Sequence, residues 1–268
     1  MLASQSSALR AFHLFLTVRS RCSIHLAASN IAADAASIHL AERRCSPEPA
    51  LFNALREETA AAFPGGAHMV SGVQQGRLLH TLVRLSRAQR VLEVGCFTGY
   101  AALWMALGLP EDGTLLSLER DERCAEIARR HFESAGVASR VELRMGDAFE
   151  SLEAIPRGSL QPFDLIFLDA DKKRTAGYFE LLMDRGLLAP HSLLLVDNVL
   201  WKGHVLDRLN GNGNDDDRPA AATAKEEGAA RRFRALRDAL HDFSLQLGED
   251  ERVRQMMLPL RDGLTFVQ

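Results

Sequence analysis

The sequence predicts an α/β fold with a mostly parallel, seven-stranded sheet, helices on both faces and an antiparallel hairpin at the C-terminal end. From residue 90 onward, short apolar segments alternate with helical patterns. This alternation is typical of β-α-β units and of a parallel sheet that is covered on both faces. Near the C-terminus, Asp262-Gly263 stands between two apolar runs and predicts the turn of a hairpin.

The individual elements follow from the spacing of apolar residues. Strands are expected at residues 90–94, 114–119, 140–145, 163–169 and 192–197. Helices are expected at residues 47–63, 74–89, 123–136 and 229–241. The stretch 207–228 is rich in Asn, Asp and Gly and then in Ala, which predicts a mobile surface loop.

Bulk properties narrow the class of protein. The 268 residues are 47% apolar and 25% charged, as in globular domains with a sizeable core. A net charge of −3 gives no basic excess, so we expect no nucleic-acid partner. Four scattered cysteines without a C-x-x-C pair predict free thiols in a reducing compartment. No apolar run reaches the roughly 18 residues that a membrane span requires.

The first 33 residues differ in composition from the rest. They contain no Asp or Glu, but they contain Arg10, Arg19, Arg21 and six serines. Arg-rich, Ser-rich and acid-poor N-termini resemble organelle transit peptides. We therefore expect a transit segment over residues 1–40, mitochondrial first and plastid second, before a single domain over residues 41–268. The alternative is a disordered tail without a targeting signal, on a cytoplasmic protein.

A glycine-bearing turn follows the first strand, in the segment VLEVGCFTGY at residues 91–100. Gly95 allows a sharp turn and close approach to a ligand. A dinucleotide fingerprint would place its second glycine where this chain has Phe97, so a bound pyrophosphate is disfavoured. Glu93 could instead accept hydrogen bonds from a cationic amino-acid group or fix the loop.

Two further acids stand at the ends of the next strands. Glu119 ends the second strand, 20 residues after Gly99, where an acid suits the two hydroxyls of a ribose. Asp147 follows the third strand, where it or the next main-chain N–H could meet an adenine edge. Each acid taken alone is better explained as a residue that ends a strand or caps a helix. Three such strand ends in order favour a nucleoside ligand.

An acid cluster is predicted farther along the chain. Asp169 and Asp197 each end a strand, and one β-α-β unit separates them, so their strands should be neighbours. With Asn198 they supply three hard oxygen ligands, which suit Mg²⁺, Mn²⁺ or Ca²⁺. Lys172 would point back over such a metal and could act as a general base. The alternative is a solvated lysine beside capping acids.

The segments EVGCFTGY, DADK and DNVLW, in this order, resemble the cation-dependent O-methyltransferases, which include caffeoyl-CoA and catechol O-methyltransferases. The resemblance covers roughly residues 48–268. It implies a Rossmann-like class I methyltransferase fold, S-adenosylmethionine as methyl donor, a divalent cation, Mg²⁺ first, and Lys172 as base. It implies metal ligands at Asp169, Asp197 and Asn198. Around the methyl donor it implies Ser71, Glu93, Gly95, Cys96, Ala101, Glu119, Ala148 and Asp171.

The chain departs from the plant members of that family at two places that we expect on the acceptor side. After DADK the plant pattern continues with Asn-Tyr, and this chain has Arg174-Thr175. Lys202 stands where the plant enzymes have a substrate-contacting asparagine. Trp201 and His204 could wall the acceptor, although Trp201 could equally serve in packing.

We therefore expect a metal-dependent O-methyltransferase that acts on an o-diphenol or a caffeoyl-CoA-like acceptor, as a homodimer without a membrane span. In this mechanism one phenol oxygen, deprotonated with the help of Lys172, attacks the methyl group of the sulfonium. Two alternatives remain open. One is a nucleotide-cofactor oxidoreductase, which Phe97 disfavours. The other is a non-catalytic organelle protein that binds S-adenosylmethionine or a partner.

Overall fold

The computed structural model describes residue 40 and residues 43–159, 161–209 and 224–268. Contacts divide the chain into residues 1–46 and residues 47–268. In the first unit only residue 40 and residues 43–46 are described, so the expected transit segment lies outside the described residues. The predicted boundary at residue 40 stays a prediction. The sheet, its helices and the candidate site all belong to the second unit.

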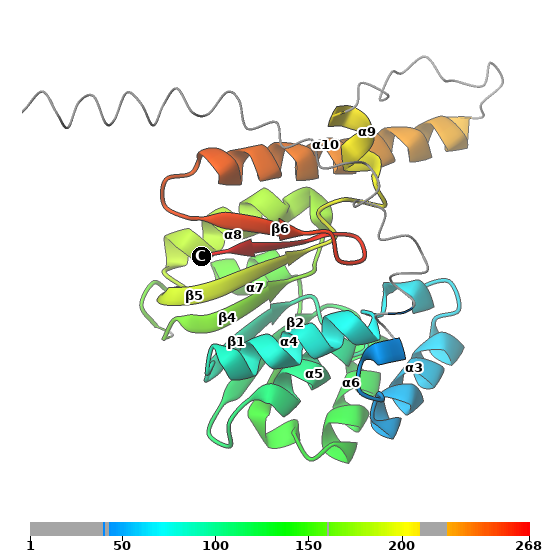
Figure 1. The fold of residues 1–268 in the computed structure, drawn as a ribbon, viewed down its shortest axis with the longest axis vertical. Coiled ribbons are helices and arrows are strands. Elements are labelled where there is room, and N and C mark those ends of the chain that lie inside the picture. The colour runs from blue at the N-terminus through cyan, green and yellow to red at the C-terminus, as the bar shows by residue number, and fades with distance from the viewer. Residues whose placement is uncertain (1–39, 41–42, 160, 210–223) are drawn as a thin grey trace, which may run out of the picture. The chain divides into compact units, whose positions relative to one another are not determined.

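Seven strands form one sheet in the order β3-β2-β1-β4-β5-β7-β6 (Figure 1). β1 to β5 are parallel, whereas β7 pairs antiparallel with β5 and β6 pairs antiparallel with β7. The predicted fold class is therefore confirmed. The strands are β1 (Arg90–Val94), β2 (Thr114–Glu119), β3 (Val141–Met145), β4 (Phe163–Leu168), β5 (Leu188–Asp197), β6 (Gln255–Leu258) and β7 (Leu264–Val267).

Helices connect and cover the strands, as the alternating pattern predicts. The α-helices are α3 (Ala50–Ala62), α4 (Val73–Leu85), α5 (Tyr100–Gly108), α6 (Glu122–Ser134), α7 (Ala148–Glu153), α8 (Thr175–Arg185), α9 (His204–Leu209) and α10 (Ala224–Glu249). Short 3₁₀ turns are η3 (Ala67–Met69), η4 (Ala138–Arg140) and η5 (Lys172–Arg174). Within the described residues, no helix combines the length and the apolarity that crossing a membrane requires.

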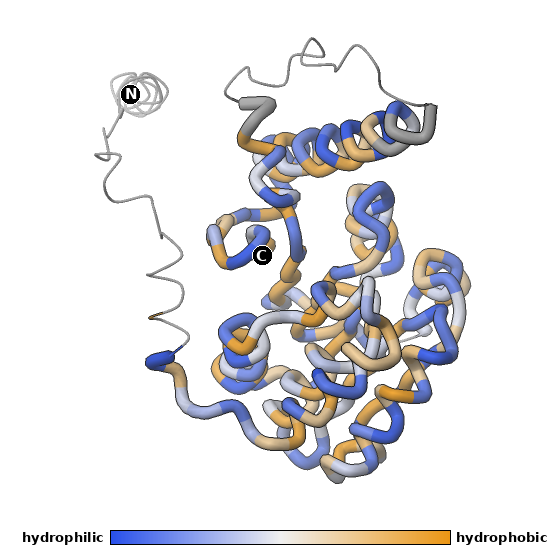
Figure 2. The backbone as a smooth tube through the Cα atoms, turned by 90° about the vertical axis from the view of Figure 1, so that its right-hand side faces the viewer, coloured by the Kyte–Doolittle hydropathy of each residue, from blue (hydrophilic) through white to orange (hydrophobic). Residues whose placement is uncertain are grey.

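Side chains alternate between the two faces of the sheet along each strand, and this divides the hydrophobic core into two clusters. In β1, Val91 joins a cluster formed with α3, α4, α5 and α6, whereas Leu92 and Val94 join a cluster formed with α7, α8 and α10. This follows from the two-residue period of a strand, which sends neighbouring side chains to opposite faces. Figure 2 shows α10 with hydrophilic and hydrophobic residues alternating along its length, as expected of a helix that buries one side.

The chain reverses its direction of winding between β1 and β4, because β2 follows on one side of β1 and β4 lies on the other. Ligands of open α/β sheets bind at such a switch point, beyond the carboxyl ends of the strands. Gly95 follows β1 here with φ of +101°. A Cβ atom at Gly95 would lie 2.6 Å from the carbonyl oxygen of Asp169. Glycine is therefore needed for both the conformation and the close approach.

The stretch 207–228, predicted as a loop, is helical at both of its ends, so that prediction was wrong there. α9 extends to Leu209 and α10 begins at Ala224 and ends at Glu249, well beyond the predicted helix at 229–241. Ala, Lys and Glu at residues 224–227 are strong helix formers and outweigh the single Gly228. Residues 210–223 lie outside the described residues.

Candidate active site

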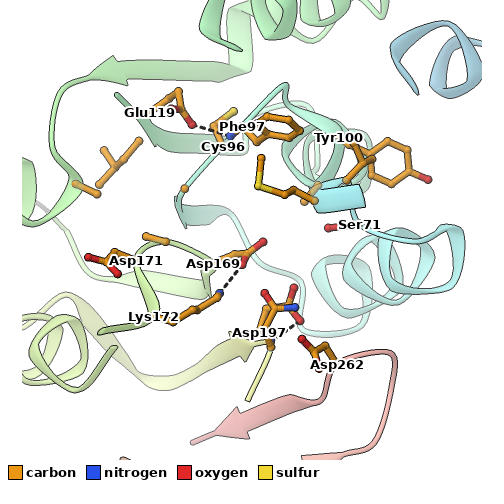
Figure 3. Close-up of a pocket in the computed structure, with 18 of the residues that line it drawn as sticks. Ser71, Cys96, Phe97, Tyr100, Glu119, Asp169, Asp171, Lys172, Asp197 and Asp262 are labelled. Atoms are coloured by element: carbon orange, nitrogen blue, oxygen red, sulfur yellow. Dashed lines mark hydrogen bonds and ion pairs between the residues drawn. The ribbon is translucent and has the colours of Figure 1, made fainter. Parts of the chain in front are cut away.

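A cavity of about 870 Å³ opens at the carboxyl ends of the parallel strands (Figure 3). Lys172 and all three predicted metal ligands line it, and so do seven of the eight residues predicted around the methyl donor. These seven are Ser71, Gly95, Cys96, Ala101, Glu119, Ala148 and Asp171. The structure thus gathers residues that span 128 positions of the sequence, from residue 71 to residue 198, around one space.

Glu119 fixes the glycine turn through main-chain hydrogen bonds. Its Oε2 accepts from the N–H of Phe97 at 2.7 Å, and its Oε1 accepts from the N–H groups of Arg120 and Asp121 at 2.8 Å each. Phe97 adopts φ of +52°, a costly conformation for a side chain of this size, and the carboxylate of Glu119 stabilises it. A carboxylate offers about four acceptor positions, so one remains for a ligand hydroxyl.

Glu93 is the predicted cofactor residue that the structure does not bring to the cavity wall. Its side chain is fully buried beneath the glycine turn. The Ser117 hydroxyl donates to Oε2, while Oε1 has no partner. Burial raises the pKa of Glu93 to about 8, so the carboxyl group is mostly protonated at neutral pH. A direct contact between Glu93 and a cationic ligand is not supported by this placement.

An arginine holds the segment that carries Ser71. Nη2 of Arg56 donates to the carbonyl oxygen of Ser71 at 3.2 Å and to the hydroxyl of Tyr100 at 2.5 Å. The Tyr100 hydroxyl donates in turn to Glu48, which also accepts from Nε of Arg56 at 3.3 Å. Burial, reinforced by Glu48, raises the pKa of Tyr100 to about 12. Sequence reasoning missed this network, because no motif joins residues 48, 56 and 100.

Asp147 caps α7 at the end of the cavity near β2 and β3. Its Oδ1 accepts from two main-chain N–H groups of α7, including that of Phe149 at 2.9 Å. Nη1 of Arg174 donates to both Asp147 oxygens, at 3.0 and 3.1 Å, and its guanidinium lies 4.2 Å from the Phe149 ring centroid. The expectation that Arg174 faces the acceptor is therefore wrong. The η5 turn directs it to Asp147, and Thr175 beside it is buried.

The opposite end of the cavity holds the acid pair. β4 and β5 are neighbours, as predicted, so Asp169 and Asp197 come together (Figure 3). Nζ of Lys172 donates to Oδ1 of Asp169 at 2.5 Å, which confirms that its ammonium points back over the acids. Asp197 is only 4% exposed. Burial first, and then the nearby Asp169 carboxylate, raises the pKa of Asp197 to about 6.

This acid pair fits a divalent cation in the chemistry of its donors. Two carboxylates in a shielded place repel each other, and a nearby positive charge relieves that repulsion. Carboxylate and amide oxygens suit Mg²⁺. Among the described residues, no three His, Cys, Asp or Glu side chains gather closely enough to hold a metal, so the third protein ligand would be the amide of Asn198. The assignment of Asp169, Asp197 and Asn198 as metal ligands stays a prediction.

Strained turns form the mouth of the cavity beside the acids. Trp201 and Lys202 have φ of +46° and +56°, and the N–H of Lys202 donates to Oδ1 of Asp262 in the β6–β7 turn. Trp201 lines the cavity, with its ring centroid 6.0 Å from that of Phe233 in α10. His204 does not line the cavity and meets Phe233 edge-on. Of the two predicted wall residues, only Trp201 reaches the cavity.

Comparisons with known proteins agree with this geometry. Residues 42–268 match the O-methyltransferase family. Caffeoyl-CoA O-methyltransferase 1 of Eucalyptus globulus is 32% identical over 241 residues, which cover 89% of each chain. The chain belongs to the O-methyltransferase family. Its predicted membership and its predicted enzyme class, an S-adenosylmethionine-dependent O-methyltransferase, are confirmed.

Two further relatives of this O-methyltransferase are informative. Catechol O-methyltransferase of Niastella koreensis is 36% identical over 162 residues, which cover 60% of this chain and 67% of the relative. The methyltransferase PaMTH1 of Podospora anserina, solved with bound SAH, superposes with a TM-score of 0.73 at 29% identity. That match covers 87% of this chain and 93% of the other, so the likeness extends across the sheet and its helices.

Proposed function

We propose that this O-methyltransferase transfers a methyl group from S-adenosylmethionine to one oxygen of a catechol-like or caffeoyl-CoA-like acceptor, with a divalent cation, Mg²⁺ first, at the acid pair. The observation that carries the proposal is the Asp169–Lys172–Asp197 arrangement, which shares one cavity with the residues around Gly95 and Glu119. The names of the Eucalyptus and Niastella relatives, and the SAH bound to the Podospora protein, support it.

The cofactor side of the cavity is suited to hold S-adenosylmethionine, which supplies an electrophilic methyl group. Gly95 has no side chain, which lets the turn main chain approach the carbonyl of Asp169 and leaves the cavity wall open for a ligand. Glu119, anchored by three N–H groups, keeps a carboxylate at the end of β2 for the ribose hydroxyls. Ser71 lies on a segment that Arg56 holds in place. Together these contacts orient the donor before reaction, which is where much catalytic advantage arises.

On the acceptor side, Asp169, Asp197 and Asn198 would hold the cation, which supplies Lewis acidity that favours loss of a phenol proton. Nζ of Lys172 lies 2.5 Å from Oδ1 of Asp169, which places the amine beside the proposed cation as the candidate base for that proton. When protonated, the same nitrogen stabilises the negative oxygen by charge. Trp201 and the buried walls near Asp197 exclude water from the reacting atoms.

The test is methyl transfer from S-adenosylmethionine to a panel of phenols by the purified chain. We expect turnover with o-diphenols, loss of that turnover in EDTA, and recovery when Mg²⁺ is restored. Phenol and m-diphenols should not react, because they lack two adjacent oxygens. Transfer to o-diphenols that persists in EDTA would disprove the metal assignment. Binding of S-adenosylmethionine without transfer to any phenol would favour the non-catalytic alternative.

The cellular location and the oligomeric state of the protein are separate proposals, because they depend on residues or partner chains that the structure does not describe. We propose that residues 1–33 address the protein to mitochondria, and a fusion of residues 1–40 to a fluorescent reporter tests this. A diffuse cytosolic signal would contradict it. We also propose a homodimer, which light scattering on the eluting protein would distinguish from a monomer.

A further inference from the structure

The mouth of the cavity near the acid pair carries a surplus of hydrogen-bond donors. Lys202 is exposed and lines the cavity, and its ammonium makes no ion pair within the described part of the chain. Arg261 also lines the cavity; its Nη1 donates to the carbonyl oxygen of Val70 at 3.1 Å, and no described carboxylate pairs with it. Nε1 of Trp201 is buried in the wall without a partner.

Charge is separated along the depth of this end of the cavity. Asp197 is buried at the floor, and Asp169 beside it already has Lys172 as a partner. Lys202 and Arg261 are exposed at the mouth, where their two positive charges outnumber the single negative charge of Asp262, which also lines the cavity. An acceptor whose reacting oxygens lie at the acids therefore directs its other substituent toward positive charge. The complement of these two cations is a group that only accepts hydrogen bonds and carries negative charge.

Hydrogen bonds join the two turns that carry Lys202 and Arg261. The N–H of Lys202 donates to Oδ1 of Asp262, and the N–H of Leu200 donates to the carbonyl oxygen of Asp262 at 2.8 Å. Arg261 is the neighbour of Asp262 in the same turn. Lys202 and Arg261 hold φ of +56° and +51°, strained values that persist because these contacts determine them. These contacts hold the two turns together, so both side chains border the same part of the cavity.

We propose that the methyl acceptor of this enzyme is an o-diphenol that carries a carboxylate, and that Lys202, together with Arg261, binds that carboxylate. The proposal rests on the proposed function for the placement of the reacting oxygens. It also accounts for Lys202, a charged residue where the plant enzymes that the sequence resembles have a neutral asparagine. The carboxylate makes the acceptor a phenolic acid.

The test compares 3,4-dihydroxybenzoate with its methyl ester, which keeps the ring and the two hydroxyls and removes the charge. Calorimetric titration of the protein loaded with S-adenosylhomocysteine and Mg²⁺ gives the binding ratio, and methyl transfer gives the ratio of kcat/KM. We expect the acid to be favoured about two- to fivefold in both, the range of an exposed ion pair. The preference should shrink as salt is added.

Three variants assign the preference to Lys202. Lys202→Gln should lower the ratio of acid to ester toward one, with the remainder due to Arg261, and Lys202→Arg should keep most of the wild-type ratio. Lys173→Gln is the matched control, because Lys173 is an exposed lysine near the same site that does not line the cavity. That control should keep the wild-type ratio. If the ratio of acid to ester falls equally in Lys202→Gln and Lys173→Gln, the preference comes from the overall positive charge near the site and not from a contact with Lys202. That result would overturn the proposal.

The remaining outcomes separate this inference from the proposed function. Equal binding of acid and ester by the wild-type protein, or binding of neither, overturns the carboxylate site. A preference for caffeoyl-CoA over caffeate also overturns it, since the anionic groups of that thioester lie far from the ring. Absence of methyl transfer to both acid and ester, while the acid still binds more tightly than the ester, overturns the proposed function and leaves the carboxylate site in place.

Discussion

The two ends of the cavity are built by different means. At the cofactor end, strand ends and main-chain N–H groups determine the shape, with Gly95 and the anchored carboxylate of Glu119 as the main features. At the acceptor end, the acids also stand at strand ends, but turns form the mouth, and Asn198, Trp201 and Lys202 all have positive φ without being glycine. The cofactor end is therefore tied to the sheet itself. The acceptor end depends on contacts between loops, which can change without disturbing the sheet.

The largest difference between the two ends is expected when the buried carboxylate of Asp197 is removed. Asp197→Ala should lower methyl transfer by about 10³-fold or more, because a site that stabilises developing charge loses a ligand. Affinity for S-adenosylhomocysteine should stay within about twofold, since Asp197 lies at the acceptor end. Calorimetry and single-turnover assays measure the two quantities. Asp184→Ala, at an exposed aspartate, is the control. A parallel loss of cofactor affinity would mean that the ends are not independent.

A second change tests the acceptor end without removing a carboxylate. Lys172→Met deletes the amine that contacts Asp169 and should lower kcat by about 10²–10⁴-fold, the usual contribution of a positioned acid–base group. Residual activity should rise with pH, because hydroxide can replace the missing base. The pH–rate profiles of the variant and of the Lys173→Met control measure this. Unchanged turnover would leave Lys172 with only an electrostatic role toward Asp169.

A third change weakens the cofactor end instead. Arg56→Met removes the donor to the Ser71 carbonyl and to Tyr100, so the segment over the cofactor should become less ordered. We expect the KM for S-adenosylmethionine to rise up to about tenfold while kcat with saturating cofactor falls less than twofold. Arg129→Met, which removes an exposed ion pair with Glu122, is the matched control. A fall in kcat at constant KM would contradict a positioning role for Arg56.

A last prediction concerns the carboxyl group of Glu93, which is buried beneath the cofactor end. Burial raises the pKa of Glu93 from 4.5 to about 8, so the folded protein holds a proton that the unfolded chain releases. Stability from this group is therefore complete below pH 4.5 and is lost as pH rises through about 8, by at most ~1.4 kcal/mol per pH unit. Glu93→Gln should flatten this slope in urea unfolding between about pH 5 and pH 8. Parallel curves for both proteins would mean that Glu93 is ionised in the fold.

The difference between the ends also explains what the sequence could predict. Strand periodicity and the acids at strand ends were sufficient to place Glu119, Asp169 and Asp197 around one cavity, because a parallel sheet aligns its carboxyl ends. The direction of Arg174 was predicted wrongly, since a short 3₁₀ turn decides it and leaves no periodic signal. The Arg56 network was missed because its partners are distant in sequence.

The close approach of Gly95 to Asp169 has a consequence for how such enzymes diversify. Only main chain separates the turn that faces the methyl donor from the strand end that carries the acid. The separation of the Gly95 turn from the strand end at Asp169 is thus set by main-chain atoms, which no side-chain substitution can lengthen. In the proposed function, new acceptors can be recruited by replacing the turns at residues 199–203 and 260–263 while the acids at the strand ends stay in place.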